Sequence, residues 1–364
     1  MLIDLHAHLS HPDMLHQHEH WGPFREFYAG AYNLRVGKWR LALSTKEVLA
    51  NRKKGAESES LESMQARRAD PAYRIHQMDA AGQDVQVISL PFHLTMYQTE
   101  KEFSARYARH VNELMARYCS AYPDRLYFWA HAPLNDPQAA LKEIDHAIGE
   151  LGAKGLSMGG ANLGGLELDD EALYPVWEKM CEYDLPLFVH GFNQSLGWGD
   201  RADQERYEIT TIVGMMHDET ACFWNLICGG VLDRFPDLKV YITHGGGYVP
   251  YHLGRFEATN ANLPTVKNKK PVREYLGNFY FDLLTHEAPM RQAILDVIGA
   301  DRLLYGTNFA GSDTVREMLT DGIRISDEDR AKIEGINAMN LLRIPPVTSV
   351  AERERPKSPV ALHL

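Results

Sequence analysis

Eight short apolar runs recur along this 364-residue chain, and they restrict its fold more than any other feature. Most of them are rich in β-branched and aromatic residues, and their apolar character is continuous rather than alternating. Continuous hydrophobicity over such lengths is typical of parallel strands that are covered on both faces. The sequence therefore predicts eight buried strands, at residues 2–6, 84–90, 125–131, 153–158, 185–190, 238–244, 278–284 and 301–307.

Longer segments with helical spacing separate these runs. In residues 136–151 apolar positions recur every three or four residues, and Asp136 is placed to cap the helix. Residues 169–184 begin with acidic side chains, which suit a helix N-terminus, and Ser326 is placed to cap one of the last helices, within residues 317–344. Strands and helices that alternate in this way predict an α/β fold, a (β/α)₈ or TIM barrel.

Two segments do not follow the alternation. Residues 11–72, between the first and second strands, are polar and basic, and we interpret them as a cap or arm inserted into the barrel. Residues 345–364 are rich in proline and charge, which is typical of an extended arm. The sequence thus predicts one barrel over residues 1–344 with an insertion and a C-terminal arm.

Composition excludes several classes of function. The 38 basic and 49 acidic residues give a net charge of −11, which argues against binding to nucleic acid. The chain has no run of about 18 apolar residues and no secretory signal, so we expect a soluble, cytoplasmic protein without membrane contact. Its 4 cysteines are scattered, which predicts reduced thiols rather than disulfides or a zinc–thiolate site.

Histidines stand at the carboxyl ends of three predicted strands. His6 and His8 end the first strand, and residues two apart on a strand point to the same side. His190 ends the fifth strand and His244 the sixth, and glycine follows each of them. Because these strand ends meet at one face of a barrel, we expect the imidazoles to converge. Such a cluster suits Zn²⁺, or Mn²⁺ or Fe²⁺ if oxygen ligands complete it.

Several motifs resemble the amidohydrolase superfamily. They are "DLHAHLS", "LPLFVHG", "DLKVYITHGGGYVPYHLGRFE" and "DRLLYGTN". The branch that they resemble is that of aminocarboxymuconate-semialdehyde decarboxylase, which also includes aromatic-acid decarboxylases, oxalomesaconate hydratase and a meta-cleavage-product hydrolase. The resemblance extends from about residue 74 to residue 344, together with the N-terminal motif.

The resemblance implies roles for individual residues. His6, His8 and His190 would hold one divalent metal ion, most often zinc. His244 would lie just off the metal and move a proton. Arg255 would position a substrate carboxylate, although a salt bridge on a helix surface is an equally good interpretation of an arginine at this position.

One position departs from the family pattern. Asn308, which we assign to the catalytic site with His244, stands where the resemblance implies an acid at the end of the eighth strand. An amide can offer its oxygen as a weak neutral ligand or hydrogen-bond acceptor, but it cannot act as a general base. His244 could be the base instead, or Asp313 could reach back to the site, or Asp282 or an acid of the insertion could take the role. We favour His244, because its position at a strand end needs no further assumption.

Other polar residues follow the predicted strands. His93 and Asn193, after the second and fifth strands, are candidate substrate contacts, as is His131 at the end of the third. The histidine-rich stretch at residues 11–20 could form a second metal site, but we interpret it as a loop that gates the barrel mouth.

These features predict a metal-dependent enzyme that acts at a C–C bond of a small carboxylated compound from aromatic-ring cleavage. Hydrolysis or hydration by metal-activated water ranks first. Non-oxidative decarboxylation ranks second, because decarboxylases of this branch depend on the acid that Asn308 replaces. A metal-binding barrel without catalytic activity is the third alternative. We also expect a homo-oligomer, a dimer or tetramer, built through the insertion and the C-terminal arm.

Overall fold

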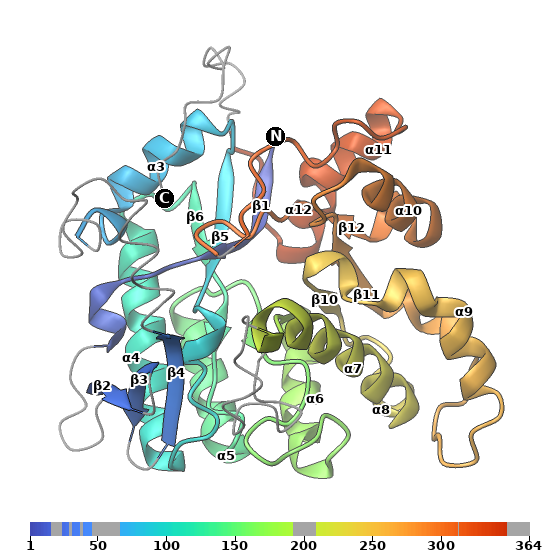
Figure 1. The fold of residues 1–364 in the computed structure, drawn as a ribbon, viewed down its shortest axis with the longest axis horizontal. Helices are drawn as coiled ribbons and strands as arrows, with labels where there is room; N and C mark the ends of the chain where they lie inside the picture. Colours follow the sequence, from blue (N-terminus) through green and yellow to red (C-terminus); the bar gives the residue numbers. More distant parts are fainter. Residues whose placement is uncertain are drawn as a thin grey trace.

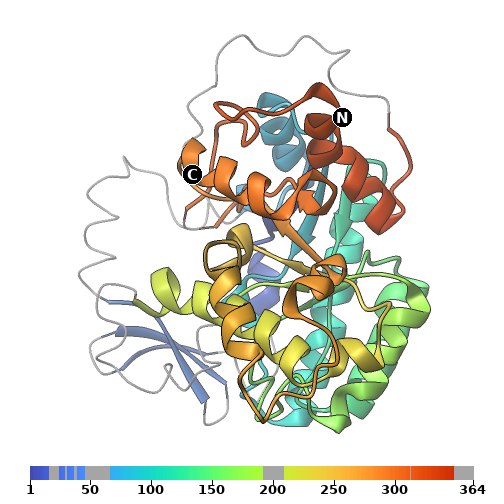
Figure 2. The same ribbon diagram turned by 90° about the vertical axis from the view of Figure 1, so that its right-hand side faces the viewer.

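A computed structural model describes residues 1–15, 24–28, 31–36, 39–45, 66–191, 209–311 and 313–347. Of these, the three short segments between residues 24 and 45, His93 and Thr210 are described by their backbone alone. Parallel strands lie at the centre and helices surround them, as Figures 1 and 2 show. The predicted α/β class and the TIM-barrel architecture are confirmed.

Every predicted strand is present at its expected place. The third predicted strand is divided at Trp129 into two short pieces, of which the first pairs with the preceding strand and the second with the following one. The barrel strands are β1 (Ile3–His8), β5 (Val85–Ser89), β6 (Leu126–Phe128), β7 (Ala130–His131), β8 (Leu156–Met158), β9 (Leu187–Val189), β10 (Val240–Ile242), β11 (Phe279–Asp282) and β12 (Leu303–Leu304).

Hydrogen bonds link the first strand to the segment that directly follows the last strand. The strand order is β1-β5-β6 in one sheet and β12-β11-β10-β9-β8-β7 in the other. The backbone N–H of Leu5 donates to the carbonyl of Tyr305 at 3.0 Å. The buried carboxylate of Asp4 adds a side-chain link, since it accepts from the Thr307 hydroxyl at 2.6 Å. The carboxyl ends of all these strands therefore lie at one face.

The helices form the outer layer of the barrel, and two of the expected caps are in place. Asp136 accepts a hydrogen bond from Ala139 N, and Ser326 accepts one from Asp329 N. The α-helices are α3 (Pro71–Ala80), α4 (Lys101–Ser120), α5 (Pro137–Ile144), α6 (Tyr174–Tyr183), α7 (Met215–Cys228), α8 (Val231–Arg234), α9 (Val249–Asn260), α10 (Ala288–Ile298), α11 (Asp327–Ala331) and α12 (Asn337–Leu342).

Short helical turns join the barrel elements to one another. They are of the 3₁₀ or π type: η1 (Pro12–Leu15), η2 (Phe92–Leu94), η3 (Asp145–Glu150), η4 (Glu171–Leu173), η6 (Thr210–Gly214), η7 (His244–Gly246), η8 (Val272–Asn278), η9 (Ala300–Arg302) and η10 (Lys332–Ile336).

A packed floor of aromatic side chains fills the barrel interior below the histidines. Trp129 stacks on Phe188 with ring centroids 4.8 Å apart, and its indole N–H donates to the carbonyl of Leu5 at 3.0 Å. The Phe188 ring in turn lies 5.9 Å from the ring of His6. The interior is thus a solid core, and chemistry is confined to the face above it.

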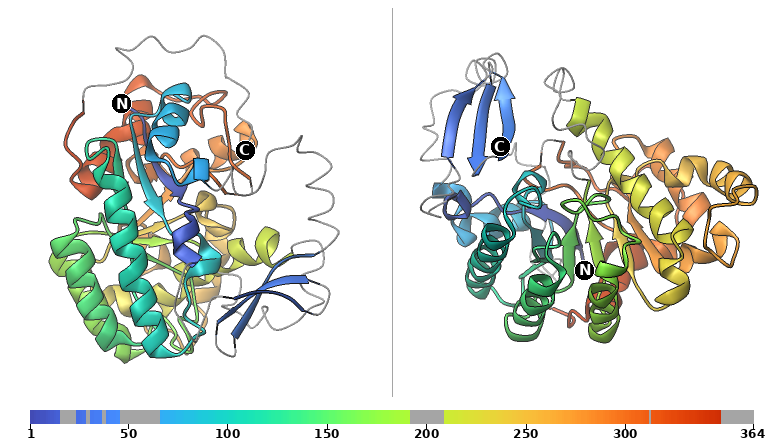
Figure 3. Two further views of the ribbon diagram at one scale, coloured as in Figure 1. Left: turned by 90° about the vertical axis from the view of Figure 1, so that its left-hand side faces the viewer. Right: turned by 90° about the horizontal axis from the view of Figure 1, so that it is seen from below.

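Part of the insertion forms a small antiparallel sheet of its own. Its strands are β2 (Phe24–Tyr28), β3 (Ala31–Val36) and β4 (Trp39–Thr45), in the order β2-β3-β4. Figure 3 shows this sheet beside the barrel body rather than within its outer layer. The remaining histidine-rich stretch after Leu15 and the arm after Val347 lie outside the described residues, so their predicted roles stay predictions.

Two further expectations concern the membrane and the thiols. No helix in the described parts of the chain is long and apolar enough to cross a membrane. The 4 cysteines are free thiols, as predicted.

Candidate functional site

Four histidine rings converge at the carboxyl ends of β1, β9 and β10. The ring centroid of His6 lies 5.4 Å from that of His8, 5.1 Å from that of His190 and 4.8 Å from that of His244. All four side chains are buried, the most exposed being His244 at 7%. His6, His190 and His244 each offer one ligand atom, and these three atoms lie within 4.8 Å of one another. The structure therefore brings together the residues that the sequence placed at three strand ends.

Buried carboxylates hold two of the imidazoles. The Nδ1 atom of His6 lies 3.2 Å from an oxygen of Asp282, and Nδ1 of His244 lies 2.7 Å from an oxygen of Glu219. Asp282 also accepts hydrogen bonds from the Tyr241 hydroxyl at 2.9 Å and from Gly245 N at 2.7 Å. Asp282 is thus occupied in orienting His6, which leaves it poorly placed as the replacement base considered from the sequence.

Neutral oxygens hold the other two imidazoles. Nδ1 of His8 lies 2.8 Å from the Ser89 hydroxyl at the end of β5. Nδ1 of His190 donates to the carbonyl of Gly191 at 3.0 Å. In every ring Nδ1 therefore lies within hydrogen-bond distance of an oxygen.

The donor set fits a divalent metal ion. Nε2 of His6 and Nε2 of His190 are buried and have no hydrogen-bond partner among the described residues. Buried polar atoms are nearly always paired, so these nitrogens indicate a partner that the polypeptide does not supply. Metal-binding histidines in general engage their second ring nitrogen with an oxygen in the same way.

The electrostatics separate His244 from its neighbours. Burial and the neighbouring imidazoles lower the pKa of His6 and of His190 well below the usual value, so both rings are neutral at pH 7. Burial alone would also lower the pKa of His244, but the Glu219 carboxylate outweighs it and raises this pKa to about 9. His244 therefore holds a proton that His6 and His190 do not.

Close backbone packing places Glu219 in this arrangement. A Cβ atom at Gly191 would collide with Met215 of α7, and one at Gly247, where φ is +60°, would collide with the Met216 carbonyl. These glycines let the first turn of α7 lie directly against the strand ends. The glycines after His190 and His244 are therefore required for the packing of α7 on the strand ends.

Glu219 is a residue that sequence reasoning missed. It is completely buried on α7 and shares the inward face with Met215, Cys222 and Phe223. Its position was visible in the sequence as an acid on an otherwise apolar helix face. Such an acid indicates a buried carboxylate, and a buried carboxylate requires a specific partner.

Asn308 lies four residues after β12, and the residue that follows it, Phe309, donates its backbone N–H to the carbonyl of His6 at 3.0 Å. The Asn308 amide N–H donates to a carboxylate oxygen of Asp313, and its Oδ1 atom is buried without a hydrogen-bond partner in the described structure. The Asp313 carboxylate also lies 3.4 Å from Nε2 of His286, and it contributes to the raised pKa of His244.

Two of the other predicted contacts, Arg255 and His131, have described side chains. Arg255 is exposed on α9, and its role stays a prediction. His131 is buried, with its ring centroid 5.5 Å from that of Tyr97. The side chain of His93 and the whole of Asn193 lie outside the described residues.

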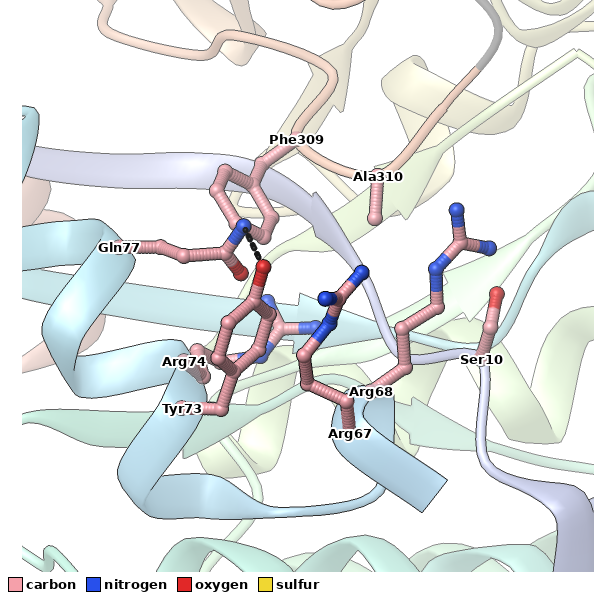
Figure 4. A pocket seen from close by; sticks show the side chains of 8 residues that line it. All are labelled: Ser10, Arg67, Arg68, Tyr73, Arg74, Gln77, Phe309 and Ala310. Atoms are coloured by element: carbon pink, nitrogen blue, oxygen red, sulfur yellow. Dashed lines mark hydrogen bonds between the residues drawn. The ribbon is translucent and has the colours of Figure 1, made fainter. Parts of the chain in front are cut away.

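A pocket with three arginines lies at the rim, between α3 and the ends of β1 and β12. Figure 4 shows the guanidinium group of Arg68 between Ser10 and Ala310. Arg74 is buried beneath, where it donates to the His8 carbonyl at 2.6 Å. The lining residues are Ser10, Arg67, Arg68, Tyr73, Arg74, Gln77, Phe309 and Ala310.

Comparisons with known proteins extend over most of the chain. The family model described as Amidohydrolase matches residues 3–344. A 2-amino-3-carboxymuconate-6-semialdehyde decarboxylase from Dictyostelium discoideum is 30% identical over 283 residues, which are 76% of this chain and 77% of that protein. A gamma-resorcylate decarboxylase from a Polaromonas species is 27% identical over 286 residues, 74% of this chain and 86% of that protein.

A hydratase and a solved structure complete the comparison. A 2-keto-4-carboxy-3-hexenedioate hydratase from a Sphingobium species is 28% identical over 256 residues, 64% of this chain and 70% of that protein. The crystal structure of a dihydroxybenzoic acid decarboxylase from Polaromonas sp. JS666, with bound manganese and an inhibitor, matches with a TM-score of 0.70 at 24% identity. The match covers 82% of this chain and 94% of that chain, and it supports the fold.

Proposed function

The chain belongs to the amidohydrolase family, and from this premise we propose that it is a metal-dependent decarboxylase of a small aromatic or dienoic carboxylic acid. The convergence of four buried imidazoles, each with Nδ1 engaged by an oxygen, is the observation that carries the proposal. The relatives with decarboxylase activity in their names support the choice of reaction.

The comparisons reverse the order of reactions derived from the sequence. Sequence reasoning placed hydrolysis or hydration first, because Asn308 removes an acid on which decarboxylases of the branch depend. Most of the similar proteins are nevertheless decarboxylases, and one is a hydratase. We therefore place decarboxylation first and keep hydration as the second candidate.

His6, His8 and His190 are the residues that we propose as metal ligands. When bound there, a divalent ion supplies positive charge for the carboxylate and the adjacent oxygen of a substrate. Zinc was expected from the family resemblance, whereas the similar dihydroxybenzoic acid decarboxylase binds manganese. The proposal therefore specifies a divalent transition-metal ion without preferring one of the two.

His244 is the residue that we propose as the proton donor. Its Nε2 proton would be transferred to the substrate carbon that carries the carboxylate. The bond from this carbon to the carboxylate then breaks, its electron pair returns to the substrate, and CO₂ leaves. Glu219, bonded to Nδ1, stabilises the imidazolium before the transfer and holds the ring in place afterwards. A proton from solvent restores the starting state.

Product analysis tests the proposal directly. Protein stripped of metal and reloaded with Mn²⁺ or Zn²⁺ is incubated with 2,6-dihydroxybenzoate and with dienoic acids from ring cleavage. A decarboxylase releases one CO₂ for each product molecule, and His244→Ala slows this release about 100-fold or more. Products that gain the mass of water without CO₂ release would favour the hydratase, and metal binding without turnover of the panel would favour a non-catalytic barrel.

A further inference from the structure

The end of the eighth strand is fixed beside the metal-site strand. The backbone N–H of Phe309 donates to the carbonyl of His6 at 3.0 Å, and the N–H of His8 donates to the carbonyl of Phe309 at 2.8 Å. These two hydrogen bonds place the backbone of the preceding residue, Asn308, at the level of the proposed ligands. The position that lacks an acid is therefore a part of the site.

The Asn308 amide has one satisfied end and one unsatisfied end. The side chain is buried, with 4% of its surface exposed. Its N–H donates to Asp313, which fixes the direction of the amide, whereas its Oδ1 atom has no hydrogen-bond partner in the described part of the chain. Since buried amide oxygens are nearly always paired, this oxygen indicates a partner from outside the polypeptide.

A tight turn holds Asp313 against the amide. Asn308 has a φ of 53°, in the left-handed region that asparagine tolerates better than most residues. Its carbonyl accepts hydrogen bonds from Gly311 N at 2.9 Å and from the Thr314 hydroxyl at 2.7 Å. A Cβ atom at Gly311 would collide with the Asn308 amide, so glycine is required for this turn.

Asp313 is a carboxylate near the cluster that is not bonded to one of its four histidines. Of the carboxylates near the cluster, Asp282 is bonded to His6 and Glu219 to His244. The eighth strand contributes a neutral amide in place of the acid that the family resemblance implies. Asp313 is bonded to that amide and carries the negative charge that the strand end lacks.

We propose that Asn308 and Asp313 act as a pair in place of the acid of strand eight. Asn308 offers its Oδ1 atom as a neutral oxygen ligand to the ion held by the histidines. Asp313 is a positioning residue, which fixes the amide through its N–H and supplies compensating charge from the second layer. This inference rests on the proposed metal-dependent function, and it leaves the proton transfer to His244.

Metal affinity provides a readout that does not depend on turnover. Binding of Mn²⁺ to metal-free protein is measured by calorimetry for the wild type, for Asp313→Asn, and for the exchange variant Asn308→Asp with Asp313→Asn. The exchange keeps the hydrogen bond but reverses its direction, and it moves the negative charge to the strand end. The matched control is Asp301→Asn, which removes an exposed carboxylate at the opposite end of the same strand.

The pair predicts a specific order of affinities. Asp313→Asn weakens Mn²⁺ binding about 10-fold or more, as loss of an outer-layer partner commonly does. The exchange variant recovers affinity to within about 3-fold of the wild type, and the control is unchanged. Electron paramagnetic resonance of bound Mn²⁺ changes in Asp313→Asn, because the hydrogen bond that holds the Asn308 amide loses its charged acceptor.

Two results would overturn the pair. One is wild-type affinity in Asp313→Asn, and the other is an exchange variant as weak as the single variant. His190→Ala separates this failure from that of the proposed function. If His190→Ala abolishes Mn²⁺ binding while Asp313→Asn does not affect it, the metal site stands and only the pair is wrong. A wild type that binds neither Mn²⁺ nor Zn²⁺ would overturn both.

Discussion

At the scale of single residues, the groups behind His190 and His244 suit these two imidazoles to different tasks. His190 faces a backbone carbonyl, which fixes the ring without adding charge. His244 faces the buried carboxylate of Glu219, which favours the protonated ring. Two histidines of the same cluster are therefore suited to different tasks, one to bind a cation and the other to give up a proton.

Alanine substitutions separate these two tasks. His190→Ala removes a proposed ligand, so we expect loss of bound metal and loss of activity. His244→Ala removes the proposed proton donor, so we expect metal content near that of the wild type and a fall in kcat of about 100-fold or more. Metal analysis and steady-state kinetics on the same preparations check both outcomes. Loss of metal from His244→Ala would make His244 a ligand and its assigned role wrong.

Glu219 gives a second test at this scale. Glu219→Gln removes the charge behind His244 but keeps an oxygen near Nδ1, so we expect kcat to fall about 100-fold with metal content unchanged. Glu143→Gln is the matched control, because Glu143 is also buried on a helix but bonds to Arg109 and Asn112 outside the site. We expect Glu143→Gln to lower the free energy of unfolding and to leave kcat unaltered. Equal kcat values for Glu219→Gln and the wild type would exclude the assigned role.

The sequence predicted the histidines of the site better than the oxygens that hold them. His6, His8, His190 and His244 could be found because each ends an apolar run and the barrel brings such ends together. Glu219 could not be paired with His244 from the sequence, since 25 residues separate them and only the packing of α7 on the strand ends joins them.

At the scale of elements, the position of α7 depends on glycines at the strand ends. The first turn of this helix lies against Gly160, Gly191 and Gly247, where any Cβ atom would meet backbone atoms of α7. Glu219 lies one turn further along the same helix. The packing of α7 on the strand ends therefore fixes the position of Glu219 relative to His244.

A substitution in this contact should reduce stability and activity together. Gly247→Ala places a Cβ against Met216 at a φ of +60°, so we expect a loss of about 2 kcal/mol in the free energy of unfolding. Urea unfolding measures the loss, and kcat should fall because Glu219 is displaced. Gly254→Ala is the control, since its Cβ would meet nothing within 4 Å. Because alanine favours a helix interior more than glycine does, we expect its free energy of unfolding to rise by about 0.5–1 kcal/mol. An unchanged midpoint for Gly247→Ala would mean that α7 can shift without cost.

Strand positions were predictable, but strand interruptions and the inserted sheet were not. Apolar runs located all eight barrel strands, because both faces of each strand are covered. The division at Trp129 leaves no mark in such a run. The inserted sheet shows alternation instead, with apolar residues at Tyr32, Leu34 and Val36 of β3, so it lacks the continuous apolar run that marks the barrel strands.

At the scale of the whole molecule, a buried histidine outside the cluster makes the stability of the barrel sensitive to acid. His131, at the end of β7, is completely buried, and burial lowers its pKa from 6.5 to about 4 against a smaller opposing effect of the Thr95 backbone. The unfolded chain therefore binds a proton at this side chain before the folded protein does. Stability that is present above pH 6.5 is lost as the pH falls toward 4.

Unfolding at two pH values measures this contribution. Between pH 7 and pH 5 the lowered pKa of His131 should cost the wild type about 2 kcal/mol in the free energy of unfolding. His131→Gln cannot be protonated, so its loss over the same interval should be smaller by about that amount. Urea titrations of metal-free protein at both pH values give the two differences. Parallel losses in the two proteins would show that His131 is not the sensitive group.

The account as a whole depends on one divalent ion held by imidazoles from different strands. Anomalous diffraction from crystals of Mn²⁺-loaded protein locates such an ion directly. We predict one strong peak at the carboxyl ends of β1 and β9, in contact with Nε2 of His6 and of His190. A map without density between these rings, or with manganese bound only elsewhere, would contradict the account.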